Sequence, residues 1–219
     1  MSFLSILKDG DNISFERIRE VAASLLPSDR TTQNKLRQDL LSDVGMLDDD
    51  DHLNMYLHSF GQLHKARLDA AFDTLPDVAS IFGSEIEVYD WSGKQGLATV
   101  CLLDFLKSKS LTSQIKQICL IDPSVASSSR ARDIISSYNS EIEVSIVGKT
   151  FEELSVEDFK PTERCRLHLF NNVLGVVDFD LMKFMHLIQT LFDGDNYFLC
   201  VGPYYDNNRQ IDDFLAAIE

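Results

Sequence analysis

The alternation of short apolar runs with helix-like segments after residue 85 is the feature that most constrains the fold. Five runs have the length and composition of buried strands: residues 86–89, 118–121, 142–147, 166–170 and 197–201. Buried strands that alternate with helices form a parallel sheet, and right-handed crossovers bring the carboxyl ends of its strands to one edge. The sequence therefore predicts an α/β chain with a Rossmann-like, doubly wound, mostly parallel sheet.

Helical periodicity predicts the other elements of the chain. Within the sheet region, helices are expected at residues 97–106, 126–138, 181–192 and 211–218. Three earlier amphipathic stretches also predict helices, at residues 14–26, 32–47 and 52–75. We divide the chain into an N-terminal helical extension, residues 1–50, and a sheet domain, residues 51–219. Because one short helix is all that follows the fifth strand, we expect the sheet to lack its last strands and the chain to be part of a longer protein.

Composition argues against several classes of function. The 219 residues carry a formal net charge of −15 without a cluster of Lys or Arg, which disfavours direct binding of nucleic acid. No apolar run reaches the ~18 residues that span a bilayer, and no basic region with a cleavage site opens the chain. We therefore expect a cytoplasmic protein without membrane contact. The four cysteines are dispersed and the five histidines are not spaced with them as ligands, so free thiols and no metal site are expected.

Four consecutive acids, Asp48 to Asp51, precede the third predicted helix. Carboxylates are favourable at the start of a helix, where they face the positive end of its dipole. We therefore expect them to open that helix, and a cation site is the alternative. The third helix is expected to be amphipathic, with core and surface residues, and the functional alternative is that it covers the ligand pocket, with polar residues such as His64 and Lys65 facing the pocket.

Residues 85–96 form the candidate ligand-binding corner: a strand that ends in Asp90, a turn with two glycines, and the start of a helix. Such a corner brings backbone N–H groups close to a ligand. A P-loop is excluded because Gly93-Lys94 is followed by Gln95 and no glycine stands five residues earlier. The Gly-x-Gly-x-x-Gly pattern of dinucleotide-binding folds is also missing, and an acid directly before the turn suits a diphosphate badly.

Acids at the ends of the first two strands suit S-adenosylmethionine better. This cofactor has no phosphate and carries a cationic sulfonium and an amino group, which Asp90 would attract. Asp122 ends the second strand, where a carboxylate can accept hydrogen bonds from the ribose hydroxyls.

Residues 90–96, Asp-Trp-Ser-Gly-Lys-Gln-Gly, resemble the first motif of class I S-adenosylmethionine-dependent methyltransferases, Asp-x-Gly-x-Gly-x-Gly. They are most similar to a bacterial subgroup with Asp-Trp-Gly-Cys-Gly-Gln-Gly. Further segments resemble motifs of that subgroup in the same order: residues 56–61, 120–124, 168–174 and 201–204. The resemblance covers residues 56–205. It implies a methyltransferase fold, S-adenosylmethionine as cofactor, and methyl transfer to an acceptor that the sequence does not identify.

The resemblance also implies roles for individual residues. The cofactor-binding positions that it implies are Asp90, Ser92, Gly93, Gly96, Asp122 and, as a possible adenine-stacking group, Phe151. Asn171 and Asn172 stand where family members place substrate-facing groups and are the catalytic candidates. Alternatively, one of them ends the fourth strand and caps the following turn. His168, within that strand, is expected to be buried and hydrogen-bonded rather than catalytic.

The turn departs from the family motif at two glycine positions. Ser92 replaces the first glycine and Lys94 the middle one. Glycine permits positive φ and close approach of a ligand to the backbone, and holding another residue there costs ~1–2 kcal/mol each. Lys94 would also repel a sulfonium. Two functions therefore stay open: a methyltransferase with an altered cofactor loop, or a catalytically inactive methyltransferase-fold interaction module of a larger assembly. The module would be completed by a protein partner or by a missing C-terminal segment.

Overall fold

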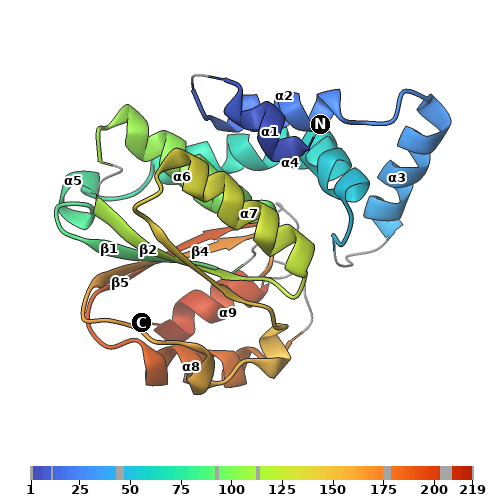
Figure 1. Ribbon diagram of the computed structural model, residues 1–219. Helices are drawn as coiled ribbons and strands as arrows, with labels where there is room; N and C mark the ends of the chain where they lie inside the picture. The colour runs from blue at the N-terminus through green and yellow to red at the C-terminus, as the bar shows by residue number, and fades with distance from the viewer. Residues whose placement is uncertain are drawn as a thin grey trace.

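The computed structural model describes residues 2–10, 12–42, 47–91, 94–111, 114–174, 179–202 and 209–218. Within these ranges the chain forms a five-stranded sheet in the order β3-β2-β1-β4-β5, and all neighbouring strands are parallel (Figure 1). The strands are β1 (Ile86–Asp90), β2 (Ile115–Ile121), β3 (Glu143–Val147), β4 (Cys165–Asn171) and β5 (Asn196–Val201). The predicted α/β class and the Rossmann-like parallel sheet are confirmed.

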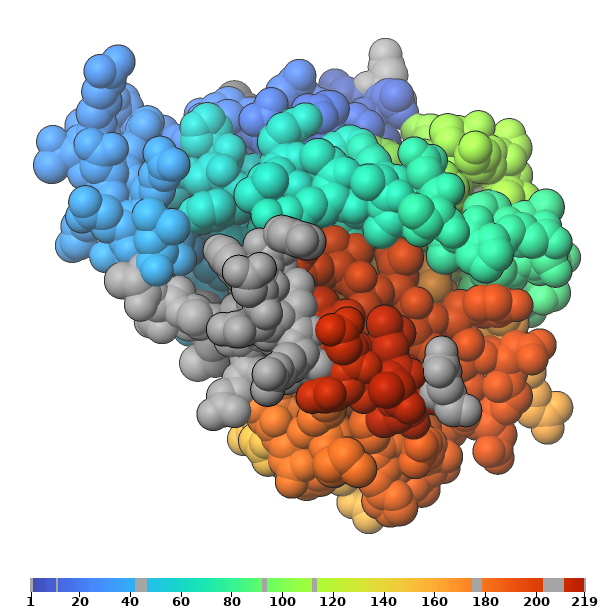
Figure 2. Space-filling view, turned by 180° about the vertical axis from the view of Figure 1, so that it is seen from behind, coloured from blue at the N-terminus to red at the C-terminus, as the bar shows by residue number. Residues whose placement is uncertain are grey.

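Helices cover both faces of the sheet (Figure 1). One face carries α6 (Leu97–Ser108) and α7 (Val125–Tyr138), and the other carries α8 (Leu181–Leu191) and α9 (Arg209–Ile218). The long helix α4 (Asp50–Phe72) packs on α6 and also contacts β5, so that in the view from behind it runs beside the C-terminal residues (Figure 2). Each of the four helices that cover the sheet, α6 to α9, matches its predicted range to within two residues at either end.

The N-terminal helices form an outer layer around α4. They are α1 (Phe3–Lys8), α2 (Phe15–Ser24) and α3 (Arg30–Ser42). Helices α2 and α3 pack on α4, and α1 packs on α2 and reaches α7. Short elements complete the described chain: α5 (Val78–Ile81), η1 (Lys94–Gly96), η3 (Phe151–Glu153) and η4 (Val156–Asp158). Sequence periodicity indicated neither α1 nor α5 as separate helices, because both are too short for a repeating apolar pattern.

The start of α4 shows what the acid run does. Asp49 is the N-cap, and its carboxylate accepts a hydrogen bond from the backbone N–H of His52 at 2.9 Å. Asp50 and Asp51 follow in the first turn, where the helix dipole favours them. The predicted helix-opening role is confirmed. Across the described ranges, no group of three or more His, Cys, Asp or Glu side chains is placed to hold a metal ion.

All four cysteines are free thiols, two of them buried and two half-buried. None of the helices that the structure describes is both long enough and apolar enough to cross a membrane.

Side chains of each strand alternate between two cores, one on each face of the sheet. In β1, Ile86 and Val88 belong to the core beneath α6 and α7, whereas Tyr89 belongs to the core beneath α8. The second core is rich in aromatic rings, and Trp91 lies at its centre, edge-on to Phe184 of α8 with ring centroids 5.1 Å apart. Because successive residues of a strand point to opposite faces, this alternation also determines which polar residues meet at the sheet edge.

Gly96 marks the closest approach of the corner turn to α7. Its φ is +62°, and a Cβ added to it would lie 3.1 Å from the Cβ of Ala131. Gly96→Ala therefore combines left-handed strain with crowding and is expected to lower the free energy of unfolding by about 1–3 kcal/mol. Gly148→Ala is the control because nothing lies within 4 Å of its added Cβ, so a change within about 0.5 kcal/mol is expected. Urea denaturation measures both, and equal losses would contradict the packing role.

Candidate functional site

Three polar residues meet on one face of the sheet at the carboxyl ends of adjacent strands. Asp90, which ends the central strand β1, pairs with Leu120 of β2 on one side and Leu169 of β4 on the other. Asp122 lies two residues after Leu120, and Asn171 lies two residues after Leu169. Because side chains alternate along a strand, both point to the face of the sheet that α6 and α7 cover. All three are buried, Asp122 with 7% and Asn171 with 4% of its surface exposed. The structure thus brings together the two predicted acids and one of the predicted catalytic residues.

Asp90 joins the end of β1 to the start of α6. Its Oδ2 accepts hydrogen bonds from the backbone N–H of Thr99, at 3.2 Å, and from the Thr99 hydroxyl, at 2.8 Å. Thr99 is in the first turn of α6, where a carboxylate is stabilised by unpaired N–H groups and the helix dipole. This gives Asp90 a structural role, and its predicted attraction for a cofactor would act in addition to it.

Asp122 is held at the start of α7 but keeps capacity for further hydrogen bonds. Its Oδ1 accepts from the backbone N–H of Ser124 at 2.7 Å, and its Oδ2 accepts from the Ser127 hydroxyl at 3.2 Å. Burial raises the pKa of Asp122 to about 6, and the nearby Lys94 ammonium opposes the rise. A carboxylate has about four acceptor positions. Above pH 6, Asp122 is therefore an ionised group with lone pairs left for a ligand.

The turn contains a strained residue that the sequence did not indicate. Ser92 and Gly93 lie outside the described residues, and strain at Ser92 and Lys94 stays a prediction. Gln95 has a φ of +60° and Gly96 a φ of +62°. Gln95 is therefore a strained non-glycine residue, and its cost is offset by the hydrogen bonds described next.

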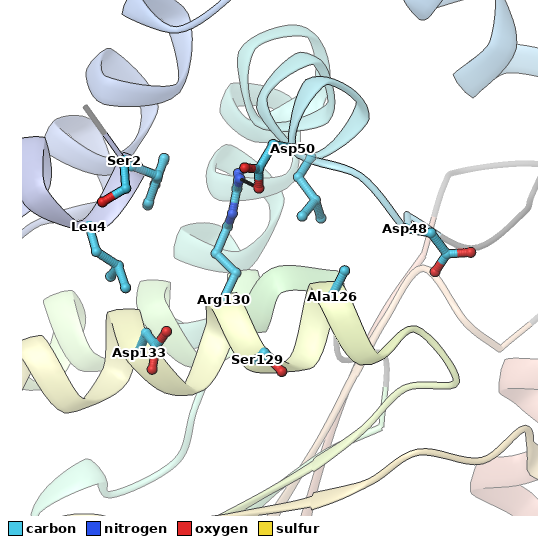
Figure 3. A pocket seen from close by; sticks show the side chains of 10 residues that line it. Ser2, Leu4, Asp48, Asp50, Ala126, Ser129, Arg130 and Asp133 are labelled. Carbon is cyan, nitrogen blue, oxygen red and sulfur yellow. Dashed lines mark hydrogen bonds and ion pairs between the residues drawn. The ribbon is translucent and has the colours of Figure 1, made fainter.

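Gln95 is tied to the N-terminal part of the chain. Its Nε2 donates to the backbone carbonyl of Leu53 at 3.0 Å, and its Oε1 accepts from Arg130 of α7 at 3.5 Å. The buried Arg130 guanidinium also donates to Asn54 Oδ1 at 2.8 Å and pairs with Asp50, so that one cation joins α7, the turn and the start of α4. Figure 3 shows Arg130 and Asp50 pointing toward each other beside a pocket of about 510 Å³.

Sequence reasoning missed both Arg130 and Gln95. A single arginine in an amphipathic helix and a glutamine in a turn have no spacing that indicates burial. The contacts of Arg130 depend on how the start of α4 crosses α7, which no local pattern records.

His64 of α4 extends this polar group above β4. It is 5% exposed, and its Nε2 lies 3.1 Å from the Tyr56 hydroxyl. Asn172 Nδ2 donates to its Nδ1 at 3.0 Å. Burial, together with the charges of Lys94 and Arg67, lowers the pKa of His64 to about 4, so the imidazole is neutral at pH 7. The structure thus brings His64 to the edge of the sheet, as the functional alternative predicts.

Lys65, unlike His64, does not lie at the edge of the sheet. Its ammonium pairs with Asp69 one turn later on α4, at 2.5 Å, and lies 5.9 Å from the centre of the Phe15 ring on α2. The functional alternative is therefore wrong for Lys65, because the side of α4 that carries Lys65 packs toward α2.

The carboxamide oxygens of Asn171 and Asn172 are buried and have no hydrogen-bond donor among the described residues. Asn171 lies close enough to His64 to oppose the lowering of the histidine pKa, but its oxygen is not in hydrogen-bonding geometry with the ring. Asn172 has a left-handed φ of +56°, and its backbone N–H donates to Val201 on β5 at 2.7 Å. A buried acceptor without a donor costs ~1–3 kcal/mol. Two such oxygens side by side indicate a place where a ligand with N–H or O–H groups, or water, completes the structure.

Lys94 supplies a positive charge at the same place. Its half-buried ammonium lies 5.8 Å from the centre of the Tyr56 ring, and it interacts electrostatically with Asp122 and with His64. We refer to the group as the edge cluster, which consists of Tyr56, His64, Lys94, Asp122, Asn171 and Asn172.

Phe151 lies apart from this cluster. The ring contacts that the structure gives it are with aromatic side chains of the second core, of which Phe179 is stacked on it with centroids 4.7 Å apart. Its stacking on an adenine stays a prediction. His168 is fully buried between the Trp91 indole, which donates to its Nδ1 at 3.1 Å, and Asn196 at 3.2 Å. The prediction that His168 is a buried, hydrogen-bonded residue is confirmed.

The edge cluster combines a carboxylate, a cation, a neutral imidazole and two unpaired amide oxygens. These groups can bind and orient a small polar ligand with hydroxyl and amino groups. Searches of protein-family models and of curated proteins found no match to the sequence. Any proposal of function therefore rests on the fold and on the edge cluster.

Proposed function

We propose that the chain is a methyltransferase that binds S-adenosylmethionine at the edge cluster. The observation that carries this proposal is the unpaired oxygen of Asn171, which is buried beside two aspartates at the carboxyl edge of a parallel sheet. In open α/β sheets ligands bind at this edge, and an acceptor left without a donor indicates that a ligand supplies one.

The residues present fit an adenosyl compound. Asp122 keeps lone pairs for two ribose hydroxyls, and Asp90 adds negative charge where an amino group would bind. When bound, the cofactor supplies a methyl group that is already activated, so positioning of the acceptor is the main task of the protein. Asn171 and Asn172 would accept hydrogen bonds from the N–H or O–H groups of that acceptor. Neutral His64 holds the Asn172 carboxamide in place, which makes it a positioning residue.

Thermal shift and calorimetry with S-adenosylmethionine and S-adenosylhomocysteine test the proposal. At 1 mM ligand and micromolar affinity, binding adds about 4 kcal/mol to the stability of the folded state, which corresponds to a rise in melting temperature of roughly 8 °C or more for a chain of this size. ATP is the control. It shares the ribose with the adenosyl compounds, but its triphosphate would lie toward the Asp90 carboxylate and be repelled by it, so no shift is expected. If neither adenosyl compound raises the melting temperature, the proposal fails.

A non-catalytic interaction module is the second candidate. It is favoured by the observation that the chain already provides hydrogen-bond donors for both aspartates, from Thr99, Ser124 and Ser127, and a cation beside Asp122. Aspartates that already have donors and a neighbouring cation need no cofactor for their stability. Absence of a shift with both adenosyl compounds would favour this function.

A further inference from the structure

The pocket in Figure 3 is separate from the edge cluster and shares no residue with it. It lies between the first residues of α1, the start of α4 and the outer side of α7. Its volume of about 510 Å³ is within the range of small-molecule sites. Apolar side chains form part of its wall: Phe3, Leu4, Leu53 and Ala126. The pocket can therefore cover the aliphatic part of a small ligand.

Arg130 lines this pocket with a guanidinium that has donors to spare. The residue is 7% exposed, and its guanidinium lies over the Phe3 ring. Nη1 donates to Asn54 and Gln95, and Nη2 donates to Asp50. The Nε–H and the second hydrogen of Nη2 have no acceptor among the described residues, and Nε is not sealed from solvent. Because Nε and Nη2 share the edge of the guanidinium that fits two carboxylate oxygens, this edge is suited to a ligand carboxylate.

Carboxylates of the pocket stand on two sides of this guanidinium (Figure 3). Asp50 pairs with Arg130 through one oxygen, and because its side chain is 85% exposed, its other oxygen is open to a ligand. Asp133 follows Arg130 by three residues on α7, a spacing that makes the two side chains neighbours on the helix surface. Within the described ranges, no Lys, Arg or His pairs with Asp133. With Asp48 also in the wall, the pocket has more negative than positive charge around one buried cation.

We infer that this pocket binds a free α-amino acid with a cationic side chain. The carboxylate binds the Nε–Nη2 edge of Arg130, the α-ammonium binds the open oxygen of Asp50, and the side-chain cation binds Asp133. An ion pair presents opposite charges side by side, which is the complement of a zwitterion. A diamine would leave the Arg130 donors without an acceptor, and a simple anion would be repelled by the carboxylates. The inference does not depend on the proposed function.

Calorimetry at pH 7.5 and low ionic strength tests the inference with L-lysine and with two analogues that each lack one charged group. One L-lysine per chain should bind, with a dissociation constant below about 1 mM. Cadaverine, which lacks the carboxylate, should bind about tenfold more weakly or worse. L-Norleucine, which lacks the side-chain ammonium, should bind about threefold to fivefold more weakly. Absence of binding by L-lysine, or an analogue that binds as tightly as L-lysine, overturns the inference.

Asp133→Asn examines the acidic end of the pocket in the full chain. Because no hydrogen bond to the Asp133 carboxylate is lost within the described part of the chain, α7 should keep its structure. The affinity for L-lysine should fall about threefold to fivefold and that for L-norleucine should stay the same. Asp212→Asn is the matched control, since it removes the same charge from an exposed position of α9, on the other face of the sheet, and should change neither affinity. An unchanged L-lysine affinity in Asp133→Asn, or equal losses for both ligands, overturns the inference. No adenosyl compound is present, so this outcome is separate from that of the proposed function.

Discussion

Replacement of Arg166 by methionine is expected to lower the free energy of unfolding by about 3–5 kcal/mol, the largest loss of stability that we predict for a single substitution. Arg166 of β4 is 3% exposed and faces Glu87 of β1, which is 1% exposed, with Nε and Oε2 3.6 Å apart. The guanidinium also donates to the backbone carbonyls of Thr162 and Asp193. Methionine has a similar length but removes the closer and more deeply buried of two guanidinium groups at the Glu87 carboxylate, because Arg164 lies 3.9 Å from its Oε1 and is half-exposed.

Arg164→Met is the matched control for this prediction. Arg164 is two residues away and half-exposed, and its closer partner is the exposed Glu85 at 3.1 Å, whereas Glu87 lies 3.9 Å from it. Exposed pairs contribute ~0–1 kcal/mol, so a loss of at most about 1 kcal/mol is expected. Urea denaturation of the two variants gives the comparison. Similar midpoints for both would show that the buried pair does not stabilise the sheet. Removal of both charges, in Glu87→Leu with Arg166→Met, should recover part of the loss.

Asp122→Asn is expected to weaken binding of S-adenosylhomocysteine about 100-fold. Hydrogen bonds to a charged acceptor contribute ~1.5–3 kcal/mol each, and the substitution removes the charge from the group proposed to hold two ribose hydroxyls. The variant keeps an oxygen that can accept from the Ser124 N–H, so the start of α7 is preserved. Ser127→Ala is the control. It removes the partner of Asp122 Oδ2 but leaves the carboxylate, and affinity should stay within about fivefold.

The pH dependence of binding provides a second measurement of the same role. The pKa of Asp122 is raised from 3.8 to about 6 by burial. Because the raised pKa favours the protonated form in the folded state, Asp122 destabilises the fold above pH 6, and this cost disappears as the pH falls toward 4. The affinity for the ligand changes with pH in the opposite direction to the stability of the fold. The ionised form holds the ribose, so affinity should fall about tenfold between pH 7 and pH 5. His64, with a pKa of about 4, stays neutral in this window. Retained affinity in Asp122→Asn, or a flat pH profile of the unaltered chain, would contradict the ribose role.

Local patterns were sufficient to predict the sheet because its strands are short, apolar and separated by clear turns. The largest difference in a strand is at β2, which begins at Ile115, three residues before the predicted start. Lys116 and Gln117 interrupt the apolar run there, and β1 and β2 shift register between Ile86 and Glu87. A polar interruption of this kind is read as a loop when only composition is considered. Pairing with β1 nevertheless extends the strand.

The candidate site was predictable only in part. The two aspartates and Asn171 could be placed together because strand order and the alternation of side chains determine where they point. Lys94, Gln95 and Arg130 could not be placed, because their contacts come from segments far apart in the sequence. Gln95 shows the limit most clearly. The turn holds Gln95 in a left-handed conformation in which its side chain bonds to Leu53, and no local pattern indicates this.

The buried guanidinium of Arg130 joins the outer helices to the turn of the ligand-binding corner. The ring of Phe3 in α1 lies 4.5 Å from it, and the carboxamide of Gln95 is on its other side. A displacement of the first helix therefore reaches the turn through one side chain. Binding of another molecule to the N-terminal helices would therefore be coupled, through Arg130, to the conformation of the turn.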